Sequence, residues 1–253
     1  STASVVTFMN GEDTTAVLCG FTIQNGLAEG YPGYTGGGVY CLSSRPNLRN
    51  LIITNNYSET EPNGAGVFLD NSDARLINCT ISENTAAHNG AGIHFKGGSA
   101  YLENVKIINN SANSRGGAIF FTYSATPVLS NVLITGNTGS NGNIVILFSS
   151  PPIFNQVTIA NNVGSNTSVG SLDIQENCEI TISNSILYNN APYEIGVYNG
   201  LANISNSLID GGFEGEGNID SDPLFVDAAN GDYHLSDYSP AIGAGTATGA
   251  PTT

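Results

Sequence analysis

The chain has 253 residues, and its six Lys and Arg residues are outnumbered by 21 Asp and Glu residues, which gives a formal net charge of −15. This charge argues against binding to nucleic acid or to anionic membranes, because both present negative surfaces that attract cationic proteins. An acidic surface instead suits solubility outside the cell and the recruitment of divalent cations. No apolar run is long enough to cross a bilayer, and the opening STASVVTF lacks a signal-peptide pattern, so we expect a mature or trimmed fragment.

A phrase of the form Leu-x-Asn-apolar-x-Ile-x-x-Asn recurs eight times along the chain. The sixth position of the phrase is usually Ile. It recurs every 22 to 30 residues, which is enough chain for three short strands and three corners. Apolar residues two apart within the phrase show strand periodicity, and nothing recurs at helical spacing. The sequence therefore predicts an all-β parallel β-helix of about eight coils over residues 15–212. The copies lie at 18–26, 48–56, 76–84, 102–110, 129–137, 154–162, 182–190 and 204–212.

A second strand in each repeat follows a glycine-rich corner, and Asn-Gly pairs at 25, 63, 89 and 141 supply residues that tolerate a positive φ. Alternation along these strands predicts two inward-facing columns. The inward residues are Val39, Val67, Ile93, Ile119 and Ile144, followed two positions later by Cys41, Leu69, Phe95, Phe121 and Ile146.

The first Asn of the phrase forms a column in which Gln substitutes once. Stacked amides can hydrogen-bond to the backbone and to the next coil, so we expect an asparagine ladder at a bend. The alternative is that these amides bind a ligand. The column is Asn50, Asn78, Asn104, Asn131, Gln156, Asn184 and Asn206.

Outward positions on the glycine-preceded strand predict a stripe that contains several aromatic residues. Flat aromatic side chains in a row suit sugar rings or a protein partner, so the aromatic and imidazole members are candidate ligand-binding residues. Two alternatives are that a loop covers the stripe, or that the stack only stabilises the sheet. The predicted stripe is Tyr40, Phe68, His94, Phe120, Val145, Asp173 and Tyr198, and its candidate ligand-binding members are Tyr40, Phe68, His94, Phe120 and Tyr198.

Asp70 and Lys96 lie two positions beyond the stripe and should be neighbours on adjacent coils. If the protein is catalytic, Lys96 or His94 is the candidate base, Arg115 binds a substrate carboxylate, and Asp70 orients the base or binds calcium.

The segment 213–253 is predicted to close the last coil. Its four aspartates could hold calcium through oxygen ligands at loop spacing, although capping hydrogen bonds are an alternative role. His234 alternates with Leu235 and is expected to face solvent. The candidate calcium ligands are Asp220, Asp222, Asp227 and Asp232.

The four cysteines do not predict a disulfide framework or a zinc site. Cys41 and Cys79 occupy inward columns, Cys19 points outward, and Cys178 lies in a loop. A bridge between Cys19 and Cys41 is allowed by the pattern but is not required by it.

These repeats resemble the right-handed parallel β-helix superfamily that includes the pectate lyases. The stretch GNIDSDPLFVDAANGDYHLSDYSPAIGAG at 217–245 is similar to the closing segment of bacterial choice-of-anchor Q domain proteins and polymorphic outer-membrane-type repeat proteins. The resemblance covers about residues 15–245 and implies a right-handed coil in a secreted or surface-attached protein. In that group the segment continues into a further strand, which implies a chain that stops early and has neighbouring domains. Residues 1–253 are expected to form one domain.

The pectate-lyase resemblance would also imply a calcium-binding Asp cluster beside a basic residue, but none of the six Lys and Arg residues lies in a dense Asp group. We therefore expect a non-catalytic, secreted or cell-surface module that binds a polysaccharide or a protein partner. The alternative is a lyase or glycoside hydrolase that acts on an acidic polysaccharide.

Overall fold

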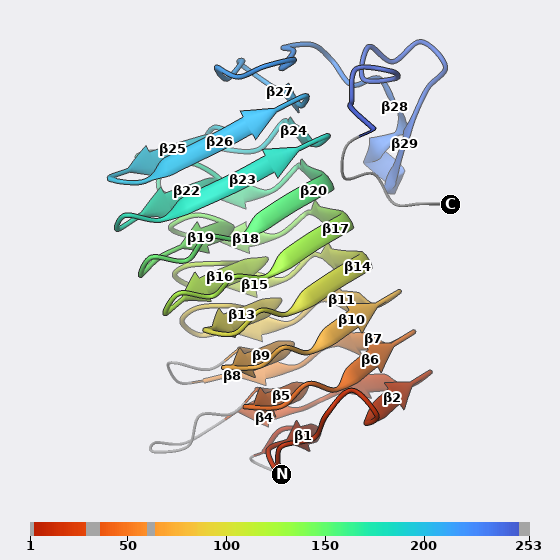
Figure 1. Ribbon diagram of the computed structural model, residues 1–253, viewed down its shortest axis with the longest axis vertical. Coiled ribbons are helices and arrows are strands. Elements are labelled where there is room, and N and C mark those ends of the chain that lie inside the picture. The colour runs from red at the N-terminus through yellow and green to blue at the C-terminus, as the bar shows by residue number, and fades with distance from the viewer. Residues whose placement is uncertain (1–2, 29–35, 60–63, 248–253) are drawn as a thin grey trace.

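The computed structural model of the chain describes residues 3–28, 36–59 and 64–247. The described residues form a right-handed parallel β-solenoid of about six turns in which three sheets run along a rod (Figure 1). This confirms the predicted fold class. About six turns rather than eight are complete, because the described part of the third sheet has six strands whereas the first has eight.

We name the three sheets A, B and C in the order in which each coil meets them. Parallel pairing within a sheet joins residues one coil apart, so each residue stacks on its counterpart in the next repeat. Sheet A consists of β1 (Val6–Phe8), β5 (Val39–Leu42), β9 (Val67–Asp70), β13 (Ile93–Lys96), β16 (Ile119–Thr122), β19 (Ile144–Ile146), β22 (Leu172–Gln175) and β25 (Ile195–Tyr198).

Sheet B bends in the middle of each coil, so its strands appear either as two short pieces or as one long one. The first halves and the long strands are β2 (Val17–Cys19), β6 (Asn47–Arg49), β10 (Arg75–Ile77), β14 (Tyr101–Ile108), β17 (Val128–Thr135), β20 (Ile153–Ala160), β23 (Glu179–Ser183) and β26 (Leu201–Ser205). The separate second halves are β3 (Thr22–Gln24), β7 (Ile52–Thr54), β11 (Thr80–Ser82), β24 (Ile186–Tyr188) and β27 (Leu208–Ile209).

Sheet C is made of two-residue strands, and the chain then closes with an antiparallel hairpin. Sheet C contains β4 (Leu27–Ala28), β8 (Tyr57–Ser58), β12 (Thr85–Ala86), β15 (Ser111–Ala112), β18 (Thr138–Gly139) and β21 (Val163–Gly164). The hairpin consists of β28 (Phe225–Asp227) and β29 (Asp232–Leu235), joined through a short 3-10 turn, η1 (Ala228–Asn230). In the part of the chain that is described, no helix is long and apolar enough to span a bilayer.

The interior of the rod is a single apolar core built from the predicted columns. All ten predicted inward residues of sheet A are buried in it, together with the Ile and Leu columns of sheet B. Cys41 and Cys79 are buried there as predicted, Cys178 is buried as well, and Cys19 is exposed. The Cys19–Cys41 bridge is absent, because all four thiols are free. Burial raises the pKa of the Cys41 thiol to about 12, so this thiol stays protonated and unreactive.

The bend in sheet B explains the first asparagine column. Asn50, Asn104 and Asn131 have φ of 52°, 54° and 52°, a left-handed conformation that asparagine tolerates better than most residues. Their side chains are exposed and stack, since Nδ2 of Asn131 donates to Oδ1 of Asn104 at 2.7 Å and Nδ2 of Asn104 donates to Oδ1 of Asn78 at 3.1 Å. The predicted ladder at a bend is confirmed.

The closing Asn of each phrase forms a second, buried ladder at the corner between sheets B and C. Each Nδ2 donates to Oδ1 of the next Asn at 2.8–3.0 Å, and each also donates to an Ile carbonyl of the preceding coil. At the last coil both carboxylate oxygens of Glu194 replace the missing amide, accepting from the backbone N–H and Nδ2 of Asn190. The amide groups of the ladder thereby bond to one another and to the backbone, as buried polar groups require. The members are Asn56, Asn84, Asn110, Asn137, Asn162 and Asn190.

Candidate functional site

The predicted outward stripe of sheet A exists as a column in register, but it is not an exposed surface. Tyr40, Phe68, His94 and Phe120 pair in sequence along β5, β9, β13 and β16. The Tyr40–Phe68 and Phe68–His94 rings stack with centroids 5.4 and 4.8 Å apart, and the His94–Phe120 rings are tilted with centroids 5.0 Å apart. Phe68 is 0% exposed and His94 is 2% exposed, and the other two are also buried. The prediction that these four residues form an exposed face is therefore wrong, and the burial favours the alternative in which the stack stabilises the sheet.

The stripe is buried because the glycine-rich corner before each strand folds back over the outer face of sheet A. A Cβ placed on Gly64 would lie 3.2 Å from Cβ of His94, and one on Gly90 would lie only 2.8 Å from it. Gly90 also has a φ of +68°, so glycine is required there both by the backbone and by the space. The glycine-rich stretches that predicted the corners are therefore also the segments that cover the stripe.

Tyr198 does not belong to this column. Gly196 occupies the position in register with Asp173, and Tyr198 pairs with Gln175 instead. Its hydroxyl contacts the hydroxyl of Tyr193 at 2.7 Å and the carbonyl of Ser168. The register error arose because the strand begins two residues earlier than the alternation suggested.

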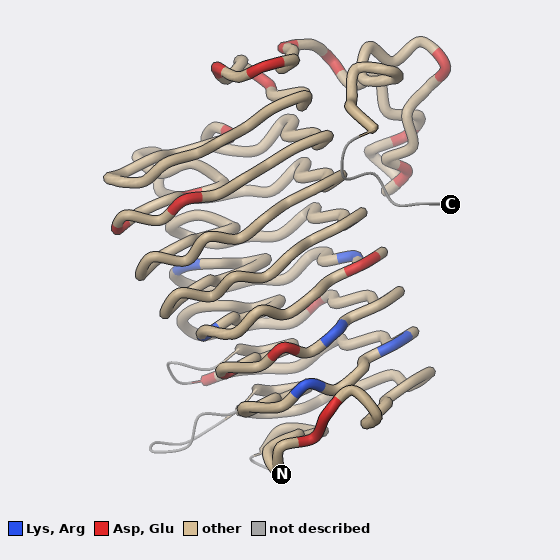
Figure 2. The backbone as a smooth tube through the Cα atoms, in the orientation of Figure 1, with Lys and Arg blue, Asp and Glu red and all other residues tan. Residues whose placement is uncertain are grey.

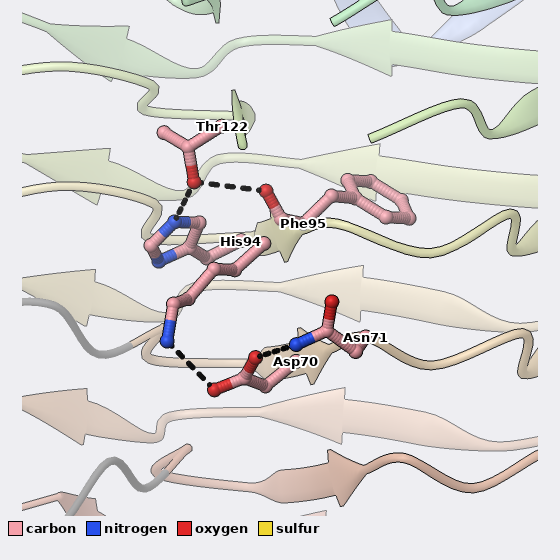
Figure 3. Close-up of polar contacts among 6 residues, drawn as sticks. Asp70, Asn71, His94, Phe95 and Thr122 are labelled. Carbon is pink, nitrogen blue, oxygen red and sulfur yellow. Dashed lines mark hydrogen bonds and ion pairs between the residues drawn. The ribbon is translucent and has the colours of Figure 1, made fainter. Parts of the chain in front are cut away.

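Asp70 and Lys96 are neighbours on adjacent coils, as predicted, and form an ion pair (Figure 3). Nζ of Lys96 lies 2.9 Å from Oδ2 of Asp70, and Nδ2 of Asn71 donates to Oδ1 of the same carboxylate at 2.8 Å. The Asp70 side chain is buried, whereas the Lys96 side chain is 19% exposed. Lys96 therefore presents a hydrogen-bond donor at the surface, and the buried Asp70 carboxylate balances its charge.

His94 is held inside the wall of the rod rather than in a cleft. Its Nε2 lies 3.1 Å from Oγ1 of Thr122, which in turn donates to the carbonyl of Phe95 at 3.3 Å (Figure 3). The imidazole is sandwiched between Phe68 and Phe120. A substrate cannot reach a ring that is buried in this way, so the geometry does not support His94 as a base or as a ligand-binding residue.

Arg115 precedes β16 at the corner that covers the stripe, and its backbone N–H donates to Oδ1 of Asn89 at 3.0 Å. Burial raises the pKa of Asp173 to about 6, and Arg115 opposes this shift through its charge. Oδ2 of Asp173 accepts from Nε2 of Gln175 at 2.6 Å, while its buried Oδ1 has no hydrogen-bond partner. Arg115 thus acts electrostatically on Asp173, a stripe residue without an assigned role in the sequence prediction.

An exposed pair of stacked aromatic residues lies one corner away from the stripe, where the chain passes from sheet A towards sheet B. Tyr123 follows β16 and is 59% exposed, and Phe148 follows β19 and is 44% exposed. Their rings stack at 5.1 Å with an interplanar angle of 25°. We call the group formed by Asp70, Asn71, Lys96, Tyr123 and Phe148 the corner patch.

Both aromatic residues of the corner patch have a backbone conformation that large side chains rarely adopt. Tyr123 has φ of 56° and Phe148 has φ of 55°, whereas the equivalent corner positions two coils and one coil earlier are Asn71 and Gly97. Such left-handed residues cost energy and cluster where structure serves function. Sequence alignment of the corners could have found them, because an aromatic residue follows a strand where Asn or Gly is the expected type.

The corner patch combines an aromatic surface with hydrogen-bonding groups. Nζ of Lys96 lies 5.9 Å from the centroid of the Tyr123 ring, within range of a cation–π contact. On the side of Tyr123 away from Phe148, the neighbouring corner residue is Gly97, which has no side chain to cover the ring. Lys96, Asp70 and Asn71 supply donors and acceptors beside it.

The four aspartates proposed for calcium each make separate turn contacts. Oδ1 of Asp220 accepts from Gly211, Oδ1 of Asp222 accepts from Leu224, and Oδ2 of Asp227 accepts from Asn230. Asp232 accepts from the backbone N–H and Nδ1 of His234. Among the residues that the structure describes, no three His, Cys, Asp or Glu side chains are grouped to hold a metal ion. The structure therefore supports the alternative role in local turns and does not support the calcium site.

Comparison with known proteins agrees with this architecture. A family model described as a right handed beta helix region matches residues 65–221, which is more than half of the chain. No curated protein and no solved structure matches. Together with the coiled parallel sheets, the match shows that the chain belongs to the right-handed β-helix family.

Proposed function

We propose that the chain is a non-catalytic β-helix module that binds a polysaccharide through the corner patch. The observation that carries the proposal is the exposed Tyr123–Phe148 pair, held in a left-handed backbone conformation that favours Gly or Asn. A corner residue with no role beyond the turn would be expected to be Gly or Asn, which adopt this conformation at a lower energetic cost. Exposed stacked aromatic side chains in a soluble protein are typical of a binding surface.

Polysaccharide suits this surface better than an apolar ligand does. A pyranose ring presents C–H groups on its faces and hydroxyls at its edges, so it can lie against an aromatic ring and still hydrogen-bond at its rim. Tyr123 offers the ring, and the Lys96 ammonium lies next to it, paired with the Asp70 carboxylate. These charged groups can donate to and accept from sugar hydroxyls without leaving a buried charge unpaired.

A location outside the cell is part of the proposal. The acidic composition and the resemblance of residues 217–245 to the closing segment of choice-of-anchor Q and polymorphic outer-membrane-type proteins support a secreted or surface-attached protein. The pectate-lyase-like resemblance supports polysaccharide as the partner in the same way, by analogy of fold.

A lyase or hydrolase function receives less support from the geometry of the candidate residues. Nζ of Lys96 is already engaged by the Asp70 carboxylate at 2.9 Å. The alternative base, His94, is buried between two aromatic rings. Binding is therefore the better supported of the two functions.

The proposal is tested by measuring the binding of the purified full chain to a panel of neutral and acidic polysaccharides by affinity electrophoresis and calorimetry. Tyr123→Ala should weaken binding about tenfold, as expected for loss of a central aromatic contact. Tyr57→Ala, which removes an exposed tyrosine on sheet C, is the matched control and should leave binding unchanged. Equal affinities for the two variants, or no polysaccharide bound at all, would reject the proposal in favour of a protein partner or another site.

A further inference from the structure

The C-terminal hairpin, β28 and β29, lies beside the rod (Figure 1). A groove lies between the hairpin and sheet B. The hydroxyl of Tyr233 lies 2.5 Å from Oγ1 of Thr135 and accepts from Nδ2 of Asn161 at 2.8 Å. The Phe225 ring packs edge-on against both Tyr188 and Tyr233. The resulting groove has a volume of about 320 Å³, at the lower end of the range for small-molecule sites.

The rod side of the groove is formed by strands β14, β17 and β20 at the bend of sheet B. Lys106, Leu133 and Thr158 are in register on these three strands and line the groove. The amide side chains of Asn104, Asn131 and Gln156 lie at the bends of the same strands and complete this wall. Each amide nitrogen carries two hydrogens, so one donor of Asn104 and one of Asn131 remain available after the ladder bonds.

The hairpin side of the groove is formed by Gly231, Tyr233 and His234. Gly231 has a φ of +85°, and no atom lies within 4 Å of the place where a Cβ would be, so this wall is open. Tyr233 is fixed by its two hydroxyl contacts and contributes a ring of defined position. Nδ1 of His234 contacts Oδ1 of the neighbouring Asp232 at 2.5 Å, so this carboxylate is paired with the imidazole.

The charge in the groove contrasts with that of the molecule. Only six residues of the chain are Lys or Arg, and Figure 2 shows acidic residues along the chain and concentrated in its C-terminal part. Lys106 is exposed on the groove wall, and the amide and hydroxyl side chains of Asn104, Asn131, Gln156 and Thr158 line the same groove. A cation with several neutral donors is the arrangement that binds a carboxylate through charge-assisted hydrogen bonds.

We propose that this groove is a second ligand site, which binds a carboxylate group carried on a small polar ring or stem. Lys106 and the hydroxyl of Thr158 donate to the carboxylate, and the Tyr233 ring lies against the remainder of the ligand. The carboxylate can belong to a sugar acid or to a free organic acid. The site lies on sheet B and the hairpin, so it is independent of the corner patch and of the function proposed for it.

The experiment is a titration of the full, isotope-labelled chain followed by NMR, with methyl glucuronide and methyl glucoside as a matched pair. The two ligands share one ring and differ in whether a carboxylate or a hydroxymethyl group is attached. We expect shifts of the Lys106, Thr158 and Gly231 amide signals with the glucuronide and none with the glucoside. Succinate is the third probe: binding equal to that of the glucuronide assigns the site to free acids, and weaker binding assigns it to sugar acids. Either result supports carboxylate recognition.

Variants test the assignment of residues. Lys106→Ala should weaken glucuronide binding about fivefold or more, because a charge-assisted hydrogen bond is lost. Arg49→Ala removes the same charge from sheet B outside the groove and should change the affinity less than about twofold. Tyr233→Phe, which removes the hydroxyl that anchors the hairpin, should weaken binding while the unfolding midpoint of the rod is kept.

The proposal is overturned if the glucuronide and the glucoside bind alike, or if Lys106→Ala and Arg49→Ala have equal effects. Absence of shifts at the groove up to about 50 mM of both carboxylate probes, well beyond the affinity range of useful sites, would overturn it as well.

Discussion

The buried stripe and the corner patch contain the same kinds of side chain within a few residues of each other, yet they have different roles. Phe68 and Phe120 in the stripe point away from the core and are nevertheless buried under glycine-rich corners. Tyr123 and Phe148 at the corner are exposed and pay a cost in backbone conformation. The direction in which a side chain points from the sheet therefore does not decide whether it is exposed in this rod. Its exposure depends on whether a corner segment covers it.

The stripe and the corner patch divide stability and binding between them. Aromatic residues in the stripe have regular strand geometry, close ring neighbours and little access to solvent, so their contribution is to packing. Aromatic residues at the corner have one ring neighbour, an irregular backbone and polar groups beside them. If this separation holds, substitutions in the stripe should alter unfolding and substitutions at the corner should alter binding.

The largest effect is expected for Phe68→Ala. The side chain is fully buried between the rings of Tyr40 and His94, and its removal leaves a cavity, so the free energy of unfolding should fall by about 3–5 kcal/mol. Urea denaturation followed by circular dichroism measures the change. Phe148→Ala is the matched control and should cost at most about 1 kcal/mol. Comparable losses for both variants would remove the distinction between the two regions.

A pH-dependent effect is expected from Asp173, the acidic member of the buried stripe. Burial raises its pKa in the folded state from 3.8 to about 6, so the folded protein holds this proton over a range where the unfolded chain has lost it. The stabilising effect of that proton is complete below the unfolded value and is lost as the pH rises through the folded one. Asp173→Asn should therefore be more stable than the parent above pH 6 by an amount on the order of 2 kcal/mol, and the difference should vanish below pH 3.8.

Denaturation of both proteins across this pH range measures the difference. Asp237→Asn, at an exposed carboxylate, is the control and should show no such trend. A difference between Asp173→Asn and the parent that grows towards acid pH would have the wrong sign and would place Asp173 in a charge-stabilised environment instead.

A smaller effect is expected where the stripe and the corner patch meet. Asp70→Asn removes the partner of the Lys96 ammonium, which is partly exposed and can turn to water, so the loss should be about 1 kcal/mol. A double-mutant cycle with Lys96→Met isolates the pair. Strict additivity of the two substitutions would show that the ion pair contributes nothing to folding.

The smallest effect on stability is expected for Tyr123→Gly. Glycine adopts the left-handed conformation without cost, which offsets the lost stacking on Phe148. The net change in the free energy of unfolding should be less than about 1 kcal/mol. A large destabilisation would mean that this tyrosine is a structural residue.

The sequence predicted the parts of the molecule that depend on the repeat. The pairing of residues between successive coils follows from the period of the sequence repeat. The prediction was therefore correct for the inward columns, the amides at the bends and the Asp70–Lys96 neighbours. Period says nothing about how a corner folds over a face, which is why the stripe was predicted to be exposed. The docking of the hairpin was equally inaccessible, because Tyr233 and Thr135 are 98 residues apart and no repeat relates them.

The central claim is that the corner patch binds polysaccharide while the stripe only stabilises the rod. Calorimetric titration of one polysaccharide that the parent binds, with folded Tyr123→Gly and folded Phe120→Leu compared, tests it most directly. We expect Tyr123→Gly to lose about tenfold in affinity, whereas Phe120→Leu should unfold at lower urea and bind as the parent does. Unchanged affinity in Tyr123→Gly, together with weaker binding in Phe120→Leu, would contradict the claim.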